Sequence, residues 1–366
     1  MVNEPVMAKM TKRERVEAAY ALHPVDRIPF VPAIYEHKGA LIGKSPSQIC
    51  RNADFLYAGL RAELETYDPD LLVVGIDVYN VEAEALGCAV RYFDESNDCP
   101  GIVTPILDGP AALSRLGLAD PESAGRMPLY LEVAGRLQAE IGHSIIIRGA
   151  VTGPYSMAAE LIGSEAFVLL TVDDPVFARR LLDFCAGMTV EFGRAFLRRG
   201  VEPIIFDSRA TPAMASPRIF RSLVEPVYRE LIFPELKAAG GRFLPLIIGG
   251  NTTPIIGDLI ATGATQLLAD FPSNLPKCCS EAERAGLAIR ANVDALLVNR
   301  GPASAVRRRA VEMLQAFHAH RGFMLGCGVV AYDGNPEHVH AIRQAIEDLA
   351  AGRLDFEREL SALNSC

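Results

Sequence analysis

The sequence of 366 residues lacks several features that mark particular protein classes. It has no tryptophan, and its eight cysteines form no Cys-x-x-Cys pair and no regular spacing, which argues against a disulfide framework or a zinc ribbon. No run approaches the roughly 18 consecutive apolar residues of a membrane span. The first twelve residues lack the basic-then-apolar order of a secretory signal. These absences predict a cytoplasmic protein that does not act at a membrane.

Clustered positive charge is also absent. The net charge is −9, the sequence pI is about 5.4, and the longest basic run is Arg307-Arg308-Arg309. A nucleic-acid surface needs grouped cations to neutralise phosphates, so no nucleic-acid partner is expected. Half of the residues are apolar and the mean hydropathy is +0.18, which is enough for a large core. The composition therefore predicts a globular protein with a large core.

Eight short apolar or β-branched runs are separated by stretches of helical pattern. Most runs are apolar at consecutive positions, as expected for strands buried on both faces of a parallel sheet. Eight strands alternating with helices favour a (β/α)₈ barrel of the TIM type over an open doubly wound sheet. We predict one barrel domain over residues 1–366. The predicted strands are 28–34, 71–74, 144–147, 203–206, 243–248, 265–269, 287–291 and 323–325.

A helical extension is predicted before the first strand. Thr11 and Glu14 have the spacing of a capping box, and Pro24 ends the pattern that follows them. The connection 77–130 is long for one strand–helix link and includes the polar loop 94–98. We expect it to carry an extra hairpin or helix.

Polar side chains recur just after the predicted strands, where a barrel of this type places its active site. Asp, Asn, Ser and Thr at such points also cap the helices that follow. Each residue alone is therefore compatible with a structural or a functional role. The residues are Glu36, His37, Asp77, Glu82, Glu84, Thr152, Tyr155, Glu160, Asp207, Ser208, Asn251, Thr252, Asp270, Asn292, Asp294 and Cys327.

Several stretches match landmarks of one known family. They are 11–19, 24–29, 77–90 with Ala85-Leu86-Gly87, Phe206-Asp207-Ser208, 250–254 (Gly-Asn-Thr-Thr-Pro), Asn292-Val293-Asp294 and 335–339 (Asn-Pro-Glu-His-Val). In this order, and over nearly the whole chain, they resemble the uroporphyrinogen decarboxylase superfamily, including its branch of corrinoid-linked methyltransferases. The resemblance implies an (α/β)₈ barrel with its site at the C-terminal mouth, in agreement with the strand count.

The resemblance to the decarboxylases themselves is incomplete. Asp77 matches their catalytic aspartate, but their catalytic tyrosine falls at Glu160 and their late histidine at Cys327. Residues 33–38, which match their substrate-binding arm, contain no arginine cluster. A glutamate in place of a tyrosine would repel the carboxylates of a porphyrinogen. Uroporphyrinogen decarboxylation is therefore not expected.

The thiol-methylating branch implies a zinc ion held by a His-x-Cys pair before Gly-Asn-Thr and by a later cysteine. This chain keeps Cys327, but the pair reads Ile247 and Gly249, which cannot bind metal. Two interpretations stay open, namely that zinc is absent or that its site is rebuilt from other residues. The candidates for a rebuilt site are Glu36, His37, Glu82, Glu84 and Glu160.

The resemblance implies a corrinoid-linked methyltransferase that moves a methyl group between a small substrate and a cobalamin-bearing partner protein, with demethylation as one direction. No Asp-x-His-x-x-Gly cobalamin motif occurs in the chain, so the corrinoid is expected on the partner. The candidate acid–base groups are Asp77, Glu160 and Asp207. The candidate substrate-binding residues are His37, Tyr155, Ser208, Asn251 and Cys327.

Two alternatives remain open. A decarboxylase acting on a smaller acid would need cations for the substrate carboxylate, and Arg148 and Arg209 near strand ends are the candidates. A non-catalytic barrel that binds a ligand or a partner would explain the degenerate zinc pair. Analogy with the family further implies a homodimer.

Overall fold

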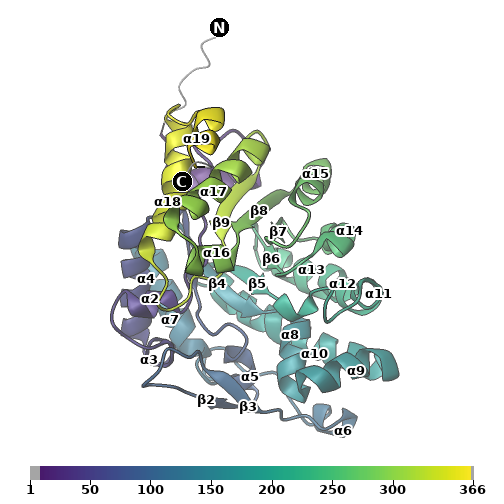
Figure 1. Ribbon diagram of the computed structural model, residues 1–366. Coiled ribbons are helices and arrows are strands. Elements are labelled where there is room, and N and C mark those ends of the chain that lie inside the picture. The colour runs from purple at the N-terminus through teal and green to yellow at the C-terminus, as the bar shows by residue number, and fades with distance from the viewer. Residues whose placement is uncertain (1–8, 364–366) are drawn as a thin grey trace.

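The computed structural model describes residues 9–363 and shows an α/β barrel (Figure 1). Seven parallel strands form one curled sheet in the spatial order β1-β4-β5-β6-β7-β8-β9. The predicted fold class is confirmed, with a difference at the first predicted strand. The strands are β1 (Leu71–Val74), β4 (Ile146–Thr152), β5 (Glu202–Phe206), β6 (Pro245–Ile247), β7 (Gln266–Ala269), β8 (Ala288–Val293) and β9 (Phe323–Cys327).

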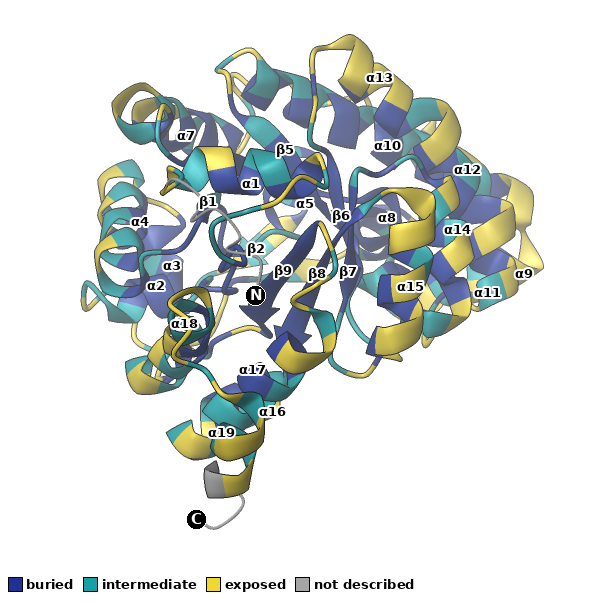
Figure 2. Cartoon of the chain, turned by 90° about the horizontal axis from the view of Figure 1, so that it is seen from above, coloured by how far each residue is buried: buried dark blue, intermediate teal, exposed yellow. Residues whose placement is uncertain are grey.

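Helices cover the outside of this sheet. In Figure 2 the buried residues lie in the strands and on the inner faces of the helices, and the exposed residues lie on the outer faces. The helices are α1 (Lys12–Tyr20), α2 (His37–Ala40), α3 (Pro46–Ile49), α4 (Ala53–Tyr67), α5 (Val81–Ala85), α6 (Pro110–Leu113), α7 (Met127–Ile141), α8 (Pro154–Ile162), α9 (Ser164–Asp173), α10 (Pro175–Leu197), α11 (Pro217–Ile219), α12 (Glu225–Val227), α13 (Phe233–Ala238), α14 (Ile256–Ala261), α15 (Leu275–Ala285), α16 (Ala295–Arg300), α17 (Ala303–Phe317), α18 (Pro336–Ala350) and α19 (Phe356–Leu363), with a 3₁₀ turn η1 (Ser208–Ala210).

Local chemistry sets several helix boundaries. The capping box predicted at Thr11 and Glu14 starts α1, with both reciprocal hydrogen bonds present. Residues 164–197 form two helices, α9 and α10, with a break at Asp174. Asp174 caps α10 and Pro175 occupies its first turn, where a missing N–H is tolerated. Among the described residues no single helix is long and apolar enough to span a membrane; α8 and α9 pass that test only as a pair bent by 109°.

Residues 28–34, predicted as the first strand, form an extended segment with a single bridge. Phe30 pairs in parallel with Leu325 of β9. Pro29 and Pro32 have no N–H to donate, and this prevents a continuous ladder of hydrogen bonds. The eighth position of the barrel is therefore filled by an extended segment that is held by separate backbone hydrogen bonds to its neighbours and not by a continuous ladder.

Asp70 joins this segment to β1. Its carboxylate is fully buried and accepts the Phe30 N–H at 2.7 Å, while its own N–H donates to the Phe30 carbonyl at 2.9 Å. Arg15 of α1 contacts the same carboxylate at 2.7 Å, and Arg27 contacts it at 2.6 Å. Because two guanidinium groups and a backbone amide share one carboxylate, α1, the extended segment and β1 meet at a single side chain.

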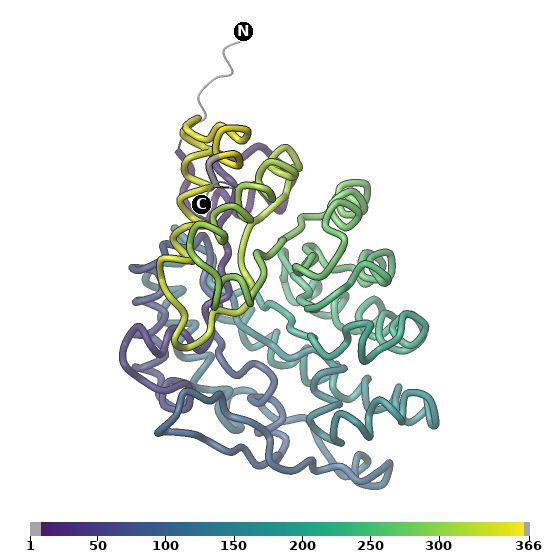
Figure 3. The backbone as a smooth tube through the Cα atoms, viewed as in Figure 1, coloured from purple at the N-terminus to yellow at the C-terminus, as the bar shows by residue number. Residues whose placement is uncertain are grey.

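The connection after β1 carries an antiparallel hairpin of β2 (Ala89–Arg91) and β3 (Gly101–Thr104), followed by α6. The extra hairpin predicted within 77–130 is therefore confirmed. In Figures 1 and 3 the hairpin lies at the opposite end of the molecule from α19.

Strand side chains alternate between the barrel interior and the outer face beneath the helices. Ile205 and Ile289 belong to the main core under the helices, whereas two smaller clusters fill the interior. The first contains Val16, Ala19, Tyr20, Val31, Leu71, Ile146, Ala288 and Met324, so α1 plugs the N-terminal end. The second contains Ala150, Ile204, Phe206, Ile247 and Leu268.

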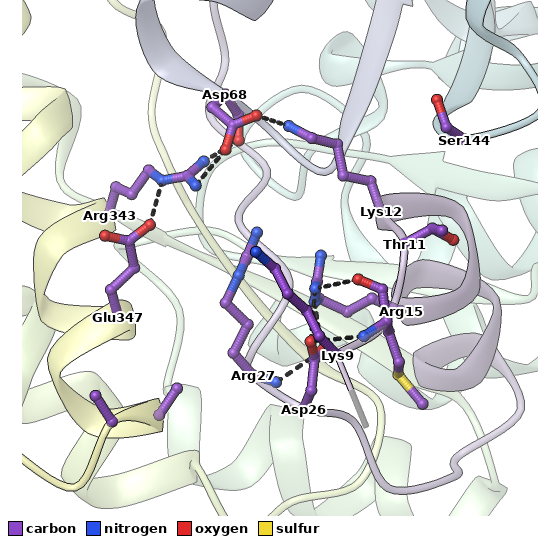
Figure 4. Close-up of a pocket in the computed structure, with 13 residues that line it drawn as sticks. Lys9, Thr11, Lys12, Arg15, Asp26, Arg27, Asp68, Ser144, Arg343 and Glu347 are labelled. Atoms are coloured by element: carbon purple, nitrogen blue, oxygen red, sulfur yellow. Dashed lines mark hydrogen bonds and ion pairs between the residues drawn. The ribbon is translucent and has the colours of Figure 1, made fainter. Parts of the chain in front are cut away.

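A cavity of about 740 Å³ lies at the N-terminal end of the barrel (Figure 4). Figure 4 shows Lys12 and Arg343 converging on Asp68, and Arg15 directed at Asp26. The charged side chains here are largely occupied by one another. Because this end of the architecture serves stability, we assign no catalytic role to the cavity.

Glu82 connects α5 to the end of β4. It is fully buried and accepts the Thr152 N–H at 2.6 Å and the Thr152 hydroxyl at 2.7 Å. Burial raises the pKa of Glu82 to about 7, against the opposing effect of these hydrogen bonds. This carboxyl therefore keeps its proton in mildly acidic solution, where an exposed glutamate is ionised.

Replacing Asp70 by Asn should strongly destabilise the barrel. The change leaves Arg15 and Arg27 without their shared buried carboxylate, and breaking a buried pair in this way costs about 3–5 kcal/mol. We expect a fall of this size in the free energy of unfolding measured in urea. Asp54→Asn is the control, since its pair with Arg136 is exposed and should contribute nothing measurable. Similar losses in both variants would contradict the closing role of Asp70.

Glu82→Gln should change how stability depends on pH. The folded-state pKa of about 7 exceeds the ordinary value of about 4.3, so the folded chain binds the extra proton between these values and stability falls as pH rises through them. Between pH 5 and pH 8 we expect this fall to be smaller in the variant by roughly 2–3 kcal/mol. Urea unfolding at both pH values measures it. Glu95→Gln, on an exposed loop, should keep the wild-type dependence.

Candidate active site

A cavity of about 620 Å³ opens at the end of the barrel where the parallel strands finish. Segments following the strands form most of its wall, and residues 99–102 of the hairpin and Glu160 of α8 complete it. Enzymes of this architecture bind their substrates at this end. The polar residues that line the cavity are Tyr35, Glu36, Asp77, Tyr79, Asn80, Cys99, Glu160, Ser208, Arg209, Asp270 and Arg290.

Apolar side chains cover much of the remaining wall. Phe206, Ile247 and Leu268 come from the upper interior cluster of the barrel, and the Tyr35 ring packs edge-on against Phe206 at 5.7 Å. A wall of this kind excludes water from the groups beside it, which strengthens their electrostatic interactions. The cavity therefore suits a small molecule with an apolar body and a few polar groups.

Glu160 and Arg209 form an ion pair on this wall. Arg209 Nη2 lies 2.6 Å from Glu160 Oε1, and η1, which carries Arg209, is tied to α8 by a hydrogen bond from the Arg209 N–H to Ser156 Oγ. Burial raises the pKa of Glu160, and Arg209 opposes that rise. Arg209 Nη1 is buried and has no hydrogen-bond partner among the described residues. Its hydrogen-bonding capacity is therefore unused within the described chain.

Asp77 lines the cavity, and its carboxylate is bound by Tyr130 and Arg126. Tyr130 of α7 donates to its Oδ1 at 2.6 Å, and Arg126 Nη2 lies 2.8 Å from its Oδ2. Arg126 also contacts Glu84 at 2.5 Å. Both oxygens of Asp77 are therefore occupied, which fixes the position of a negative charge in the cavity wall.

Glu36 presents a carboxyl with a different environment. It follows the extended segment, lines the cavity and makes no ion pair with any described residue. Burial raises its pKa, and a backbone hydrogen bond and the charge of Lys38 oppose that rise. A carboxyl that is partly desolvated and makes no ion pair keeps its proton to higher pH than an exposed glutamate, which suits a proton donor.

A polar chain joins β8 to the end of β7, and the sequence marked its members Asp270 and Asn292 but missed Arg290. Arg290 donates to Asn292 Oδ1 at 3.0 Å, Asn292 donates to Asp270 Oδ1 at 3.2 Å, and Asp270 accepts the Gly250 N–H at 3.0 Å. Arginine and asparagine two positions apart in an apolar strand share one face. This spacing could have placed Arg290 in the barrel interior.

Asp207 and Tyr155 lie outside the cavity lining, contrary to the roles expected from the sequence. Asp207 is fully buried and accepts the N–H groups of Tyr155 and Ser156 at the start of α8, together with the Tyr228 hydroxyl at 2.7 Å. It acts as a cap for α8. Tyr155 is also fully buried, and its hydroxyl donates to the Met214 carbonyl. Ser208, next along the chain from Asp207, does line the cavity.

His37 and Asn251 are also placed away from the cavity. Two backbone carbonyls face His37 Nδ1 at 2.9 Å, so this nitrogen carries the proton and Nε2 accepts from Tyr67 at 2.6 Å. Burial lowers the pKa of His37, which favours this neutral form. Asn251 is exposed and its side chain accepts the Thr253 N–H. Both residues serve local structure.

The residues present do not fit the zinc site implied by the thiol-methylating branch. Ile247 and Gly249 line the cavity without a donor atom. Cys327 packs into the main core outside the sheet, and burial raises the pKa of its thiol to about 11, which opposes the thiolate that a metal requires. The substrate-binding role expected for Cys327 is therefore not supported.

A rebuilt metal site is contradicted as well. Glu82 is bound to Thr152, Glu84 to Arg126 and His37 to Tyr67, so these side chains do not meet Glu36 and Glu160. No group of three or more His, Cys, Asp or Glu residues suited to a metal ion occurs within residues 9–363.

Known proteins of similar sequence are enzymes. Methylcobamide:CoM methyltransferase MtbA of Methanosarcina acetivorans is 24% identical over 294 residues, covering 76% of this chain and 82% of its own length. Uroporphyrinogen decarboxylase of Prochlorococcus marinus is 22% identical over 295 residues, covering 78% and 80%. A solved methyltransferase from Methanosarcina mazei superposes with a TM-score of 0.82 at 21% identity, over 93% of this chain and 99% of its own, and supports the barrel fold.

A family model that matches most of the chain confirms the family expected from the motifs. The family model described as uroporphyrinogen decarboxylase (URO-D) matches residues 11–349. Because this match runs from α1 to α18, the chain belongs to the uroporphyrinogen decarboxylase family.

Proposed function

We propose that this chain is a methyltransferase that takes a methyl group from a small methylated substrate and passes it to the corrinoid of a partner protein. Its relatives named methylcobamide:CoM methyltransferases match over most of their length and support methyl transfer as the reaction class. One observation carries the direction of transfer. Glu36 offers a carboxyl of raised pKa, with no cation bound to it, in a largely apolar cavity.

Demethylation of an ether needs a proton donor of this kind. The bond between the methyl carbon and the ether oxygen breaks, its electron pair stays on the oxygen, and the oxygen takes up a proton. The reduced corrinoid of the partner supplies the electron pair for the new bond to the methyl carbon. The substrate leaves as an alcohol and the corrinoid leaves methylated, so atoms and charge balance. A positioned acid typically accelerates such a step by about 10²–10⁴-fold.

The other charged groups fit orienting roles. The Glu160–Arg209 pair has a fixed geometry and leaves Arg209 Nη1 free to bind the substrate. Asp77 is occupied by Tyr130 and Arg126 and sets the charge of the wall. We therefore assign proton donation to Glu36, which the sequence marked only as a metal candidate, and not to the Asp77, Glu160 and Asp207 set.

Decarboxylation of a small acid is a second candidate, because two arginines line the cavity. Arg209 does so as the sequence predicted, and Arg290 accompanies it. Arg148, the other cation expected there, lies below the cavity because β4 continues to Thr152; its guanidinium donates to Tyr20 at 2.9 Å. Release of carbon dioxide without any corrinoid would favour this candidate.

Glu36→Gln should slow demethylation by about 100-fold or more, since the amide cannot replace the lost acid. The reaction is followed by the cobalt absorption bands of a reduced corrinoid protein mixed with the enzyme and a panel of methyl ethers. The wild-type rate should fall as pH rises through the raised pKa of Glu36, because only the protonated form donates. The variant should show a low rate without this fall.

Glu165→Gln on α9 is the matched control, since Glu165 is exposed and lies outside the cavity lining. It should keep the wild-type rate and pH profile. A Glu36→Gln enzyme with the wild-type rate would refute the acid role. Failure of the wild-type enzyme to methylate any corrinoid protein with the whole panel would refute the proposed reaction.

A further inference from the structure

Arg290 is a buried cation in the floor of the cavity. Its side chain is 4% exposed and belongs to β8, whose alternate residues Ile289 and Ala291 pack outward into the main core. The alternation directs Arg290 into the barrel interior, and it lines the cavity there.

Arg290 differs from Arg15 and Arg126 in having no direct ion pair with a described residue, and its nearest printed link to a carboxylate runs through Asn292 to Asp270. Arg15 contacts two carboxylates, Asp26 and Asp70, and Arg126 likewise contacts Asp77 and Glu84. Arg290 makes hydrogen bonds to Asn292 and to the Cys327 carbonyl at 3.3 Å, and no ion pair with any described residue.

An unpaired buried guanidinium is unfavourable. Arginine does not lose its proton in proteins, so it cannot escape the cost of burial by becoming neutral. Buried charges are therefore normally matched by an opposite charge. A substrate anion in the cavity would supply the missing charge.

The surroundings hold Arg290 in a defined position. At Gly326 of β9 a Cβ atom would lie 2.9 Å from Arg290 Nε, 3.0 Å from Asn292 Oδ1 and 2.1 Å from the Val31 carbonyl oxygen. Only glycine leaves room for the guanidinium group there. Asn292 fixes Nε, so the group is oriented before any ligand arrives.

We propose that Arg290 binds an anionic group of the substrate, of the carboxylate or sulfonate type. This inference rests on the proposed function in that it names the class of methylated substrate. The anionic group lies at the floor against Arg290, and the apolar body lies along Phe206, Ile247 and Leu268. Oxyanions with two oxygens on one edge suit this site because a guanidinium group can bind both oxygens through two parallel hydrogen bonds.

Binding of three aromatic probes tests the proposal without corrinoid or turnover. Benzoate and benzenesulfonate carry the anion, and benzamide is the neutral counterpart. By calorimetry, we expect at least one of the two anions to bind wild type about 10-fold or more tightly than benzamide. Arg290→Met should abolish this preference and leave benzamide binding within about threefold of wild type.

Two further variants separate recognition from folding. Arg290→Met should melt at or above the wild-type temperature without ligand, because replacing an unpaired buried charge by an apolar side chain is neutral or stabilising. Arg300→Met, exposed at the end of α16, should keep the wild-type preference. If Arg290 served only to stabilise the fold, Arg290→Met would instead melt at a lower temperature than wild type.

Equal binding of all three probes by wild type, binding of none, or an anion preference that survives in Arg290→Met would overturn the proposal. These outcomes are independent of methyl transfer. An enzyme that prefers anions but methylates no corrinoid would refute the proposed function alone. An enzyme that demethylates neutral ethers and ignores both anions would refute this inference alone.

Discussion

One buried carboxylate ties the first segment of the barrel to β1 and to α1. Asp70 binds two arginines and the backbone of Phe30, and it does so where a strand ladder would normally join the first and second strands. Prolines at 29 and 32 remove the donors that a ladder needs. Tyr35 and Glu36 follow directly from this segment, so the same carboxylate that closes the barrel also fixes one side of the cavity.

The rule that buried charges need partners links the fold to the site. Arg15 satisfies it through Asp70, and Arg126 satisfies it through Asp77. Both pairs are complete within the chain and act as structure. Arg290 is the exception, and it lies where a ligand can reach it. The difference between a structural and a functional arginine here is whether the counter-charge belongs to the protein.

The sequence predicted the barrel because continuous apolar runs identify strands buried on both faces, and seven of the eight runs are strands. It failed at 28–34 because hydrophobic pattern does not register missing N–H donors. The sequence could not distinguish the role of Asp207 from that of Glu160. Whether an acidic side chain caps a helix or lines a cavity depends on the groups that other segments bring near it. Arg290 was not marked from the sequence, although its spacing of two from Asn292 in an apolar strand could have placed it in the barrel interior.

Ile247 and Gly249 stand where the resemblance would place metal ligands. At Gly249 a Cβ atom would meet Asp270 Oδ2 at 3.5 Å and Ser208 Oγ at 3.7 Å, which are ordinary contacts, so packing does not require the glycine. Neither position therefore carries a metal-ligating side chain. At Gly249 the space that a ligating side chain would fill is open to the cavity, whereas at Ile247 an apolar side chain occupies the wall.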